Sequence, residues 1–132
     1  MNLVRISSHL VGLGYELGKM DCFSLIVEYM KMRGCKIPET FEELTLETYA
    51  DLFIIDPAKA KEIMIRFMQS QTDELSIGEC FAGDIALLSC DDTIFLSIVG
   101  GNGTCIGATT EYGVRVLPMN IYKIKRVFRC HL

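Results

Sequence analysis

The spacing of apolar positions divides the chain into a helical first part and a strand-forming second part. Up to about residue 75, apolar side chains recur every three or four positions, as in amphipathic helices. After about residue 83 they form short runs separated by turn residues, as in strands. Helices followed by consecutive antiparallel strands predict an α+β fold with segregated layers. The 132 residues are expected to form one domain over 1–132, with a helical part at about 1–75 and a sheet at about 83–130.

The helical part is predicted to contain one weak segment and three stronger ones. Asp21 is a good N-cap, and Gly34 is a favourable stop for the helix that begins there. Asp56 and Pro57 are the residue types preferred at the start of a later helix. The predicted helices lie at 2–13 (weak), 21–34, about 45–54 and from 57 onward. The last carries an apolar stripe that indicates core and not a cofactor site: Ala60, Ile63, Met64, Phe67 and Met68.

Turn residues separate the remaining segments. Glycines interrupt residues 12–20, and residues 70–80 are polar, so both segments are predicted to be loops. The predicted strands lie at 85–88, 93–99, 104–108, 113–117 and 123–130. The turns between them include Asp91-Asp92 and the glycine-rich residues 100–103.

The charge of the chain excludes one class of function. The formal net charge is −4, whereas nucleic-acid binding needs clustered Lys and Arg to neutralise phosphates. The basic residues at 123–126 alternate with an apolar one and indicate the solvent face of a strand. The N-terminal residues lack a basic leader followed by a long apolar run, so we expect synthesis in the cytoplasm without a signal peptide. We also expect no membrane insertion.

Six cysteines are present, and no two have the CxxC spacing of common zinc sites. Without a secretory leader, a disulfide framework is also not expected. Most of these cysteines are therefore predicted to be small buried residues, and no metal or cofactor is expected. A metal-binding module that uses Cys130 and His131 is the alternative that these residues leave open.

Cys22 stands at the predicted start of a helix, directly after the capping residue Asp21. Unpaired backbone N–H groups and the helix dipole stabilise a thiolate there, and the same groups can stabilise an oxyanion. Asp21 opposes thiolate formation unless its charge is used in capping. The periodicity allows a second interpretation, in which Cys22 is simply the first core-facing residue of an amphipathic helix.

Several motifs, in order, resemble the NlpC-type cell-wall peptidases, a papain-like family, and most closely the versions associated with phage tail tips. The resemblance covers about residues 10 to 129. The matching residues are Tyr15 and Gly18, the segment 21–26 with Cys22, Gly34 to Pro38, Ala82-Gly83-Asp84, Gly101-Asn102-Gly103, residues 105–108 and Gly113-Val114. The resemblance implies a papain-like fold in which N-terminal helices pack on an antiparallel sheet, with Cys22 at the nucleophile position.

The same resemblance shows where this chain departs from the family. The family's base histidine falls at Phe95, or at Thr93 or Ile94 if the register slips. The orienting position of the family is Gly107, and Phe23 puts a bulky ring beside the thiol.

The chain has only two histidines, His9 and His131, and neither stands where the resemblance needs a base. Asp91 and Asp92 could at best orient a base supplied from elsewhere. Loss of the general base removes a contribution of about 100- to 10,000-fold to the rate.

Two functions are therefore expected from the resemblance. The first is a non-catalytic structural or assembly protein of a phage tail tip, incorporated into a virion, with other tail or assembly proteins as partners. The second is an active cysteine peptidase or amidase that cleaves peptidoglycan peptides, with Cys22 as nucleophile and a base at His9, at His131 or on a neighbouring subunit. Both allow contact with peptidoglycan.

Overall fold

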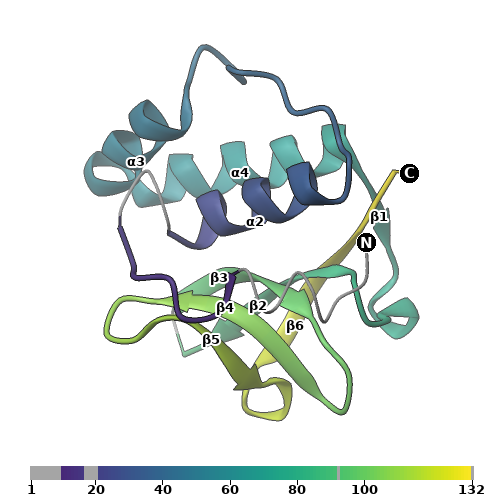
Figure 1. The fold of residues 1–132 in the computed structure, drawn as a ribbon. Helices are drawn as coiled ribbons and strands as arrows, with labels where there is room; N and C mark the ends of the chain where they lie inside the picture. The colour runs from purple at the N-terminus through teal and green to yellow at the C-terminus, as the bar shows by residue number, and fades with distance from the viewer. Residues whose placement is uncertain (1–9, 17–20, 92, 132) are drawn as a thin grey trace.

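The computed structural model describes residues 10–16, 21–91 and 93–131. Within them the chain forms three α-helices followed by a six-stranded antiparallel sheet (Figure 1). The helices are α2 (Cys22–Met32), α3 (Leu46–Ile55) and α4 (Pro57–Gln71). The strands are β1 (Thr72–Leu75), β2 (Ile85–Cys90), β3 (Thr93–Val99), β4 (Thr104–Thr109), β5 (Gly113–Pro118) and β6 (Lys123–Cys130). The α+β class predicted from the sequence is confirmed.

Helix α2 begins and ends, and helix α4 begins, at the residues that the sequence predicts. The Asp21 carboxylate accepts a hydrogen bond from the backbone N–H of Ser24 at 2.8 Å, which caps α2. Gly34 has a φ of +88° and follows the last turn, where the N–H of Cys35 reaches back to the carbonyl of Met30. Pro57 occupies the first turn of α4, as expected.

The sheet has the strand order β1-β6-β2-β3-β4-β5, and every pair is antiparallel. The five predicted strands are present with small differences at their ends. The C-terminal strand β6 does not lie at an edge, because it pairs with β2 on one side and with β1 on the other.

The prediction that residues 70–80 form a loop is wrong over most of its length, because residues 70 and 71 already belong to α4. Residues Thr72–Leu75 form β1, and Ile77–Glu79 form a short 3-10 helix, η1. β1 is a four-residue edge strand with two exposed acidic side chains, so it lacks the apolar alternation that signals a strand. It forms because it pairs with β6 along its whole length.

All three helices lie on one side of the sheet (Figure 1). α2 is buried on two sides, because Leu25, Ile26 and Met30 belong to the core shared with the sheet while Phe23 packs against Phe67 of α4. This core also contains alternate residues of the strands, among them Leu96, Ile98 and Ile106. Since side chains alternate across a strand, these positions define the face of the sheet that the helices cover.

A smaller apolar cluster covers the other face of the sheet. Its buried members are Ala86, Leu88, Val99 and Cys105, with Phe95, Leu117 and Tyr122 among the residues packed on them. The rings of Phe95 and Tyr122 meet edge to face with centroids 5.0 Å apart. The sheet therefore separates two apolar layers, of which the helices cover only one.

The described N-terminal residues contact the far edge of the sheet. The N–H of Gly12 donates to the carbonyl of Val114, and the N–H of Val114 donates to the carbonyl of Leu13, each at 2.8 Å. A Cβ at Gly113 would overlap the Leu13 carbonyl, so this contact requires glycine at position 113. Residues 2–9 of the predicted helix at 2–13 and residues 17–20 of the predicted loop at 12–20 lie outside the described residues.

In the described part of the chain, no helix combines the length and the apolar composition that a membrane crossing requires.

Candidate active site around Cys22

Cys22 is the first residue of α2 and borders a cavity of about 370 Å³. The cavity lies where the start of α2 meets the junction of α3 and α4 and the first residues of β3. Its polar lining residues include Tyr15, Asp21, Tyr49, Lys61 and Thr93. Helix capping by Asp21 fixes the direction in which α2 starts, and so fixes where the thiol lies.

The Cys22 thiol is held in its neutral form. Burial, and to a smaller extent the negative charge of Asp21, raise its pKa to about 11, although hydrogen bonds with the backbone at Leu96 and Phe23 act in the opposite direction. At pH 7.5 a thiol with this pKa is ionised in roughly one molecule in 3,000, against about one in thirty for a cysteine with the ordinary pKa of 9.0. The helix N-terminus therefore does not overcome desolvation at this position.

Asp21 has two effects on the site. Its side chain is 5% exposed and caps the helix through the Ser24 N–H, as the sequence predicts. It also adds negative charge beside Cys22, so the capping that positions the thiol also disfavours the thiolate.

Two tyrosines border the same cavity. Burial raises the pKa of Tyr49 above the range of ordinary tyrosines, and burial also raises the pKa of Tyr15. Both phenols are therefore neutral near pH 7, when they can donate a hydrogen bond but cannot serve as a strong base. Tyr15 is one of the motif residues named from the sequence, whereas no sequence pattern pointed to Tyr49 or Lys61.

Among the residues of β3, Thr93 and Ile94 line the cavity with Cys22. Phe95 and Gly107 do not face it. Phe95 belongs to the cluster on the opposite face of the sheet, and a Cβ at Gly107 would lie 3.3 Å from the Phe95 ring. The expectation that these two residues face Cys22 is therefore corrected, because strand alternation turns position 95 away and position 94 toward the helices. Thr93 and Ile94, the alternative positions named from the sequence, are the residues of β3 that share the cavity with Cys22.

None of the described residues lining the cavity is a histidine. The His131 ring instead contacts the carboxylate of Asp73 on β1, with Nε2 2.9 Å from Oδ1. Its backbone carbonyl accepts from the thiol of Cys35, which follows the C-terminal end of α2. The eleven residues of α2 span roughly 15 Å, so His131 lies near the far end of the helix from Cys22. His9 and Asp92 lie outside the described residues.

The Phe23 ring occupies space in the wall of the cavity that Cys22 borders. Its ring is 6% exposed and packs against Tyr49 and Phe67, with centroid separations of 4.7 Å and 5.1 Å. The ring thus joins α2 to both of the other helices and forms part of the cavity wall.

The cysteines of the described residues do not form a metal-binding site. All six are free thiols, and Cys105 and Cys130 are buried. No group of three or more His, Cys, Asp or Glu side chains within the described residues is placed to hold a metal ion. Cys130 lies beside Cys35 and not with the His131 ring, which pairs with Asp73.

The sequence matches no protein-family model, and a search of curated proteins also finds no match.

Proposed function

We propose that this protein is a non-catalytic structural or assembly component of a phage tail tip, built on an NlpC-type hydrolase fold. Two observations support the proposal. The sequence motifs that resemble this family occur in the family's order, from Tyr15 to Val114. The arrangement is also of the expected kind, with a cysteine at the N-terminus of a helix that packs on an antiparallel sheet.

The absence of catalytic activity is inferred from the residues that line the cavity at Cys22. Of its described lining residues, none is a histidine: the titratable ones besides Cys22 are Asp21, whose carboxylate caps α2, two neutral tyrosines and Lys61. Ile94 is the apolar residue of β3 in the lining. A thiol with a pKa of about 11 needs a partner that accepts its proton, and general-base catalysis contributes about 100- to 10,000-fold. Without that partner, hydrolysis near neutral pH is expected at background rate.

An active cysteine peptidase or amidase is the second candidate, because the cavity of about 370 Å³ leaves room for a substrate beside Cys22. In this case Cys22 attacks a wall-peptide carbonyl, and a histidine from outside the described residues or from a neighbouring subunit accepts the thiol proton. The two candidates differ in whether any activity depends on Cys22.

Digestion of purified cell-wall sacculi separates the candidates. Wild type and Cys22→Ala are incubated with sacculi from several bacterial wall types, and released amino groups are counted. Cys90→Ala is the matched control, since Cys90 is an exposed free thiol at the end of β2. We expect equal, background release from all three. Release by wild type and Cys90→Ala that is lost in Cys22→Ala contradicts the proposal.

The assembly role needs a separate readout. In a phage whose copy of this gene is deleted, wild type and Cys22→Ala supplied in trans are both expected to restore complete tails and infectivity. Restoration by wild type alone contradicts a non-catalytic role, and failure of both to change tail assembly contradicts an assembly role.

A further inference from the structure

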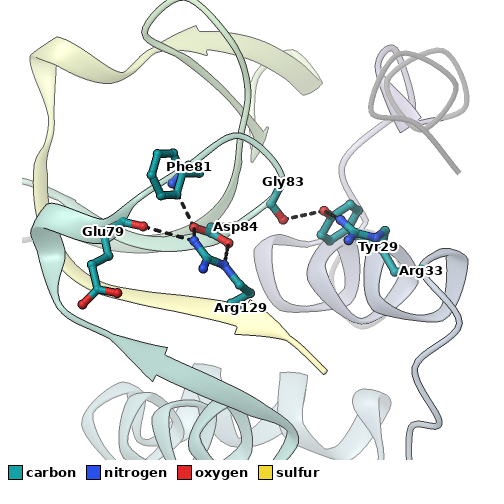
Figure 2. Close-up of polar contacts among 7 residues, drawn as sticks. All are labelled: Tyr29, Arg33, Glu79, Phe81, Gly83, Asp84 and Arg129. Atoms are coloured by element: carbon teal, nitrogen blue, oxygen red, sulfur yellow. Dashed lines mark hydrogen bonds and ion pairs between the residues drawn. The ribbon is translucent and has the colours of Figure 1, made fainter. Parts of the chain in front are cut away.

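The turn before β2 holds a buried carboxylate whose oxygens are both occupied. Asp84 is 3% exposed. Arg129 Nε donates to Oδ1 at 2.8 Å and Nη2 donates to Oδ2 at 2.9 Å, while the N–H of Phe81 also donates to Oδ2 (Figure 2). This bidentate pair neutralises the carboxylate and fixes the plane of the Arg129 guanidinium.

A second guanidinium group stands across the same turn. Arg33, which caps the C-terminal end of α2, donates from Nη1 to the Tyr29 hydroxyl at 2.6 Å. That hydroxyl in turn donates to the carbonyl of Gly83 at 2.5 Å, so Gly83 lies between the two arrangements (Figure 2). Among the described residues, Tyr29 is the only side chain that hydrogen-bonds Arg33, and no carboxylate there forms an ion pair with it. Nε and Nη2 of Arg33 therefore keep donors for a ligand.

A cavity of about 270 Å³ borders both guanidinium groups. Its remaining wall includes Phe81 and Ala82, and the Phe81 ring is 67% exposed and lies 5.6 Å from the Arg129 guanidinium carbon. Gly83 has a φ of +97°, and a Cβ there would lie 3.3 Å from Arg33 Nη1. Glycine at this position therefore keeps the space beside Arg33 open.

The charges around this cavity select the class of ligand. The residues that line the cavity include two guanidinium groups and one carboxylate, which leaves a single positive charge in the lining. The Glu79 carboxylate acts on Arg129 from outside this lining, and the Glu79 carbonyl accepts from Arg129 Nη2 at 3.2 Å. A singly charged anion balances the charge of the lining, whereas a doubly charged phosphate would meet Asp84 and the negative end of α2 with excess charge. Guanidinium groups bind carboxylates with planar, paired hydrogen bonds. The exposed Phe81 ring offers contact to an apolar group attached to that carboxylate.

We propose that this cavity binds a carboxylate carried on an apolar body, with Arg33 as its main donor and Phe81 as its apolar wall. The chemistry fits two sources, which are the C-terminal carboxylate of a partner polypeptide with an apolar last residue and a free small carboxylate. The inference stands apart from the proposed function, because it uses the opposite end of α2 and no property of Cys22.

NMR titration of the ¹⁵N-labelled full chain tests the proposal. The probes are N-acetyl-phenylalanine, its amide, inorganic phosphate and a tetrapeptide ending in phenylalanine. We expect the carboxylate probes to shift the Nε–H signals of Arg33 and Arg129 saturably, with the amide at least about tenfold weaker. Tighter binding of the tetrapeptide than of the single residue assigns the site to a polypeptide C-terminus, and equal binding assigns it to a small carboxylate.

Arg33→Gln tests which donor matters, and Arg33→Lys keeps the charge but loses the planar pair of donors. We expect about tenfold weaker binding for Arg33→Gln and an intermediate value for Arg33→Lys. Arg66→Gln is the matched control, since Arg66 is an exposed arginine paired with Glu42. Unchanged amide spectra elsewhere confirm that each variant is folded. Equal binding of acid and amide, stronger binding of phosphate, no saturable shift, or no effect of Arg33→Gln overturns the proposal.

Discussion

The two ends of helix α2 differ in the contacts that their polar side chains make. At the N-terminal end, the Cys22 thiol is buried beside an acidic residue and two neutral tyrosines, and its pKa is raised to about 11. At the C-terminal end, Tyr29 and Arg33 join the turn at Gly83, where Asp84 is held by a bidentate arginine. Each end has a buried, hydrogen-bonded carboxylate, Asp21 at one end and Asp84 at the other. At the N-terminal end the carboxylate raises the pKa of a neighbouring thiol, whereas at the C-terminal end it forms an ion pair with Arg129.

The largest effect on stability is expected from the buried carboxylate Asp84, beside the C-terminal end of α2. Asp84→Ala leaves the N–H of Phe81 and the guanidinium of Arg129 without their acceptor, so we expect the free energy of unfolding to fall by about 3 kcal/mol. Asp73→Ala removes an exposed acidic partner of His131 and is expected to cost less than about 1 kcal/mol. Urea unfolding of both variants checks this prediction. Equal losses of unfolding free energy would contradict the conclusion that the buried Asp84–Arg129 pair stabilises the fold more than the exposed Asp73–His131 pair.

A pH dependence should mark the Cys22 end. The folded pKa of the thiol is about 11 against an ordinary 9.0, so above pH 9 the unfolded chain loses this proton first. Stability from this group is therefore complete below pH 9 and is lost as pH rises through 11, by an amount on the order of 2 to 3 kcal/mol. Urea unfolding between pH 8 and 11 should show a steeper fall for wild type than for Cys22→Ala. If the free energy of unfolding falls equally with pH in both proteins, burial does not raise the pKa of the Cys22 thiol.

Loss of one hydroxyl at the C-terminal end should have a smaller effect. Tyr29→Phe removes the donor to the Gly83 carbonyl and the acceptor for Arg33, in a side chain that is fully buried. We expect the free energy of unfolding to fall by about 1 to 2 kcal/mol. Tyr112→Phe is the matched control, because Tyr112 is 65% exposed and should change stability by less than about 0.5 kcal/mol. Thermal unfolding of the two variants is the measurement. If Tyr29→Phe leaves the stability unchanged, the Tyr29 hydrogen bonds do not stabilise the fold.

The smallest effect is expected for Cys22→Ser. The residue as a whole is partly exposed although its thiol is buried, and the change keeps the size of a side chain that borders a cavity, so stability should change by less than about 1 kcal/mol. Urea unfolding at pH 7 provides the value. A loss well above this would indicate that Cys22 is a core residue, as the second sequence interpretation has it.

The helices and most strands could be predicted because local signals specify them. Asp21, Gly34 and Pro57 act within their own turns, and the strands from β2 to β6 carry apolar runs bounded by turn residues. β1 could not be predicted, because its polar residues become a strand only by pairing with β6, more than 50 residues later.

The candidate site was predictable only in part, for a related reason. Capping by Asp21 is local, so the position of Cys22 at a helix start follows from sequence. Which β3 residue faces the thiol depends on register, and a shift of one residue exchanges Phe95 for Ile94. Tyr49 and Lys61 reach the cavity from other helices, and no sequence spacing links them to Cys22.

The ionisation of Cys22 tests the central claim most directly. Thiolate absorbance near 240 nm is followed from pH 5 to 12 in wild type and Cys22→Ser, and the difference between the two curves isolates this thiol. We expect a midpoint near 11, set by burial and by Asp21. A midpoint below about 7.5 would show that a positively charged partner stabilises the thiolate, and would contradict the conclusion that Cys22 is not an activated nucleophile.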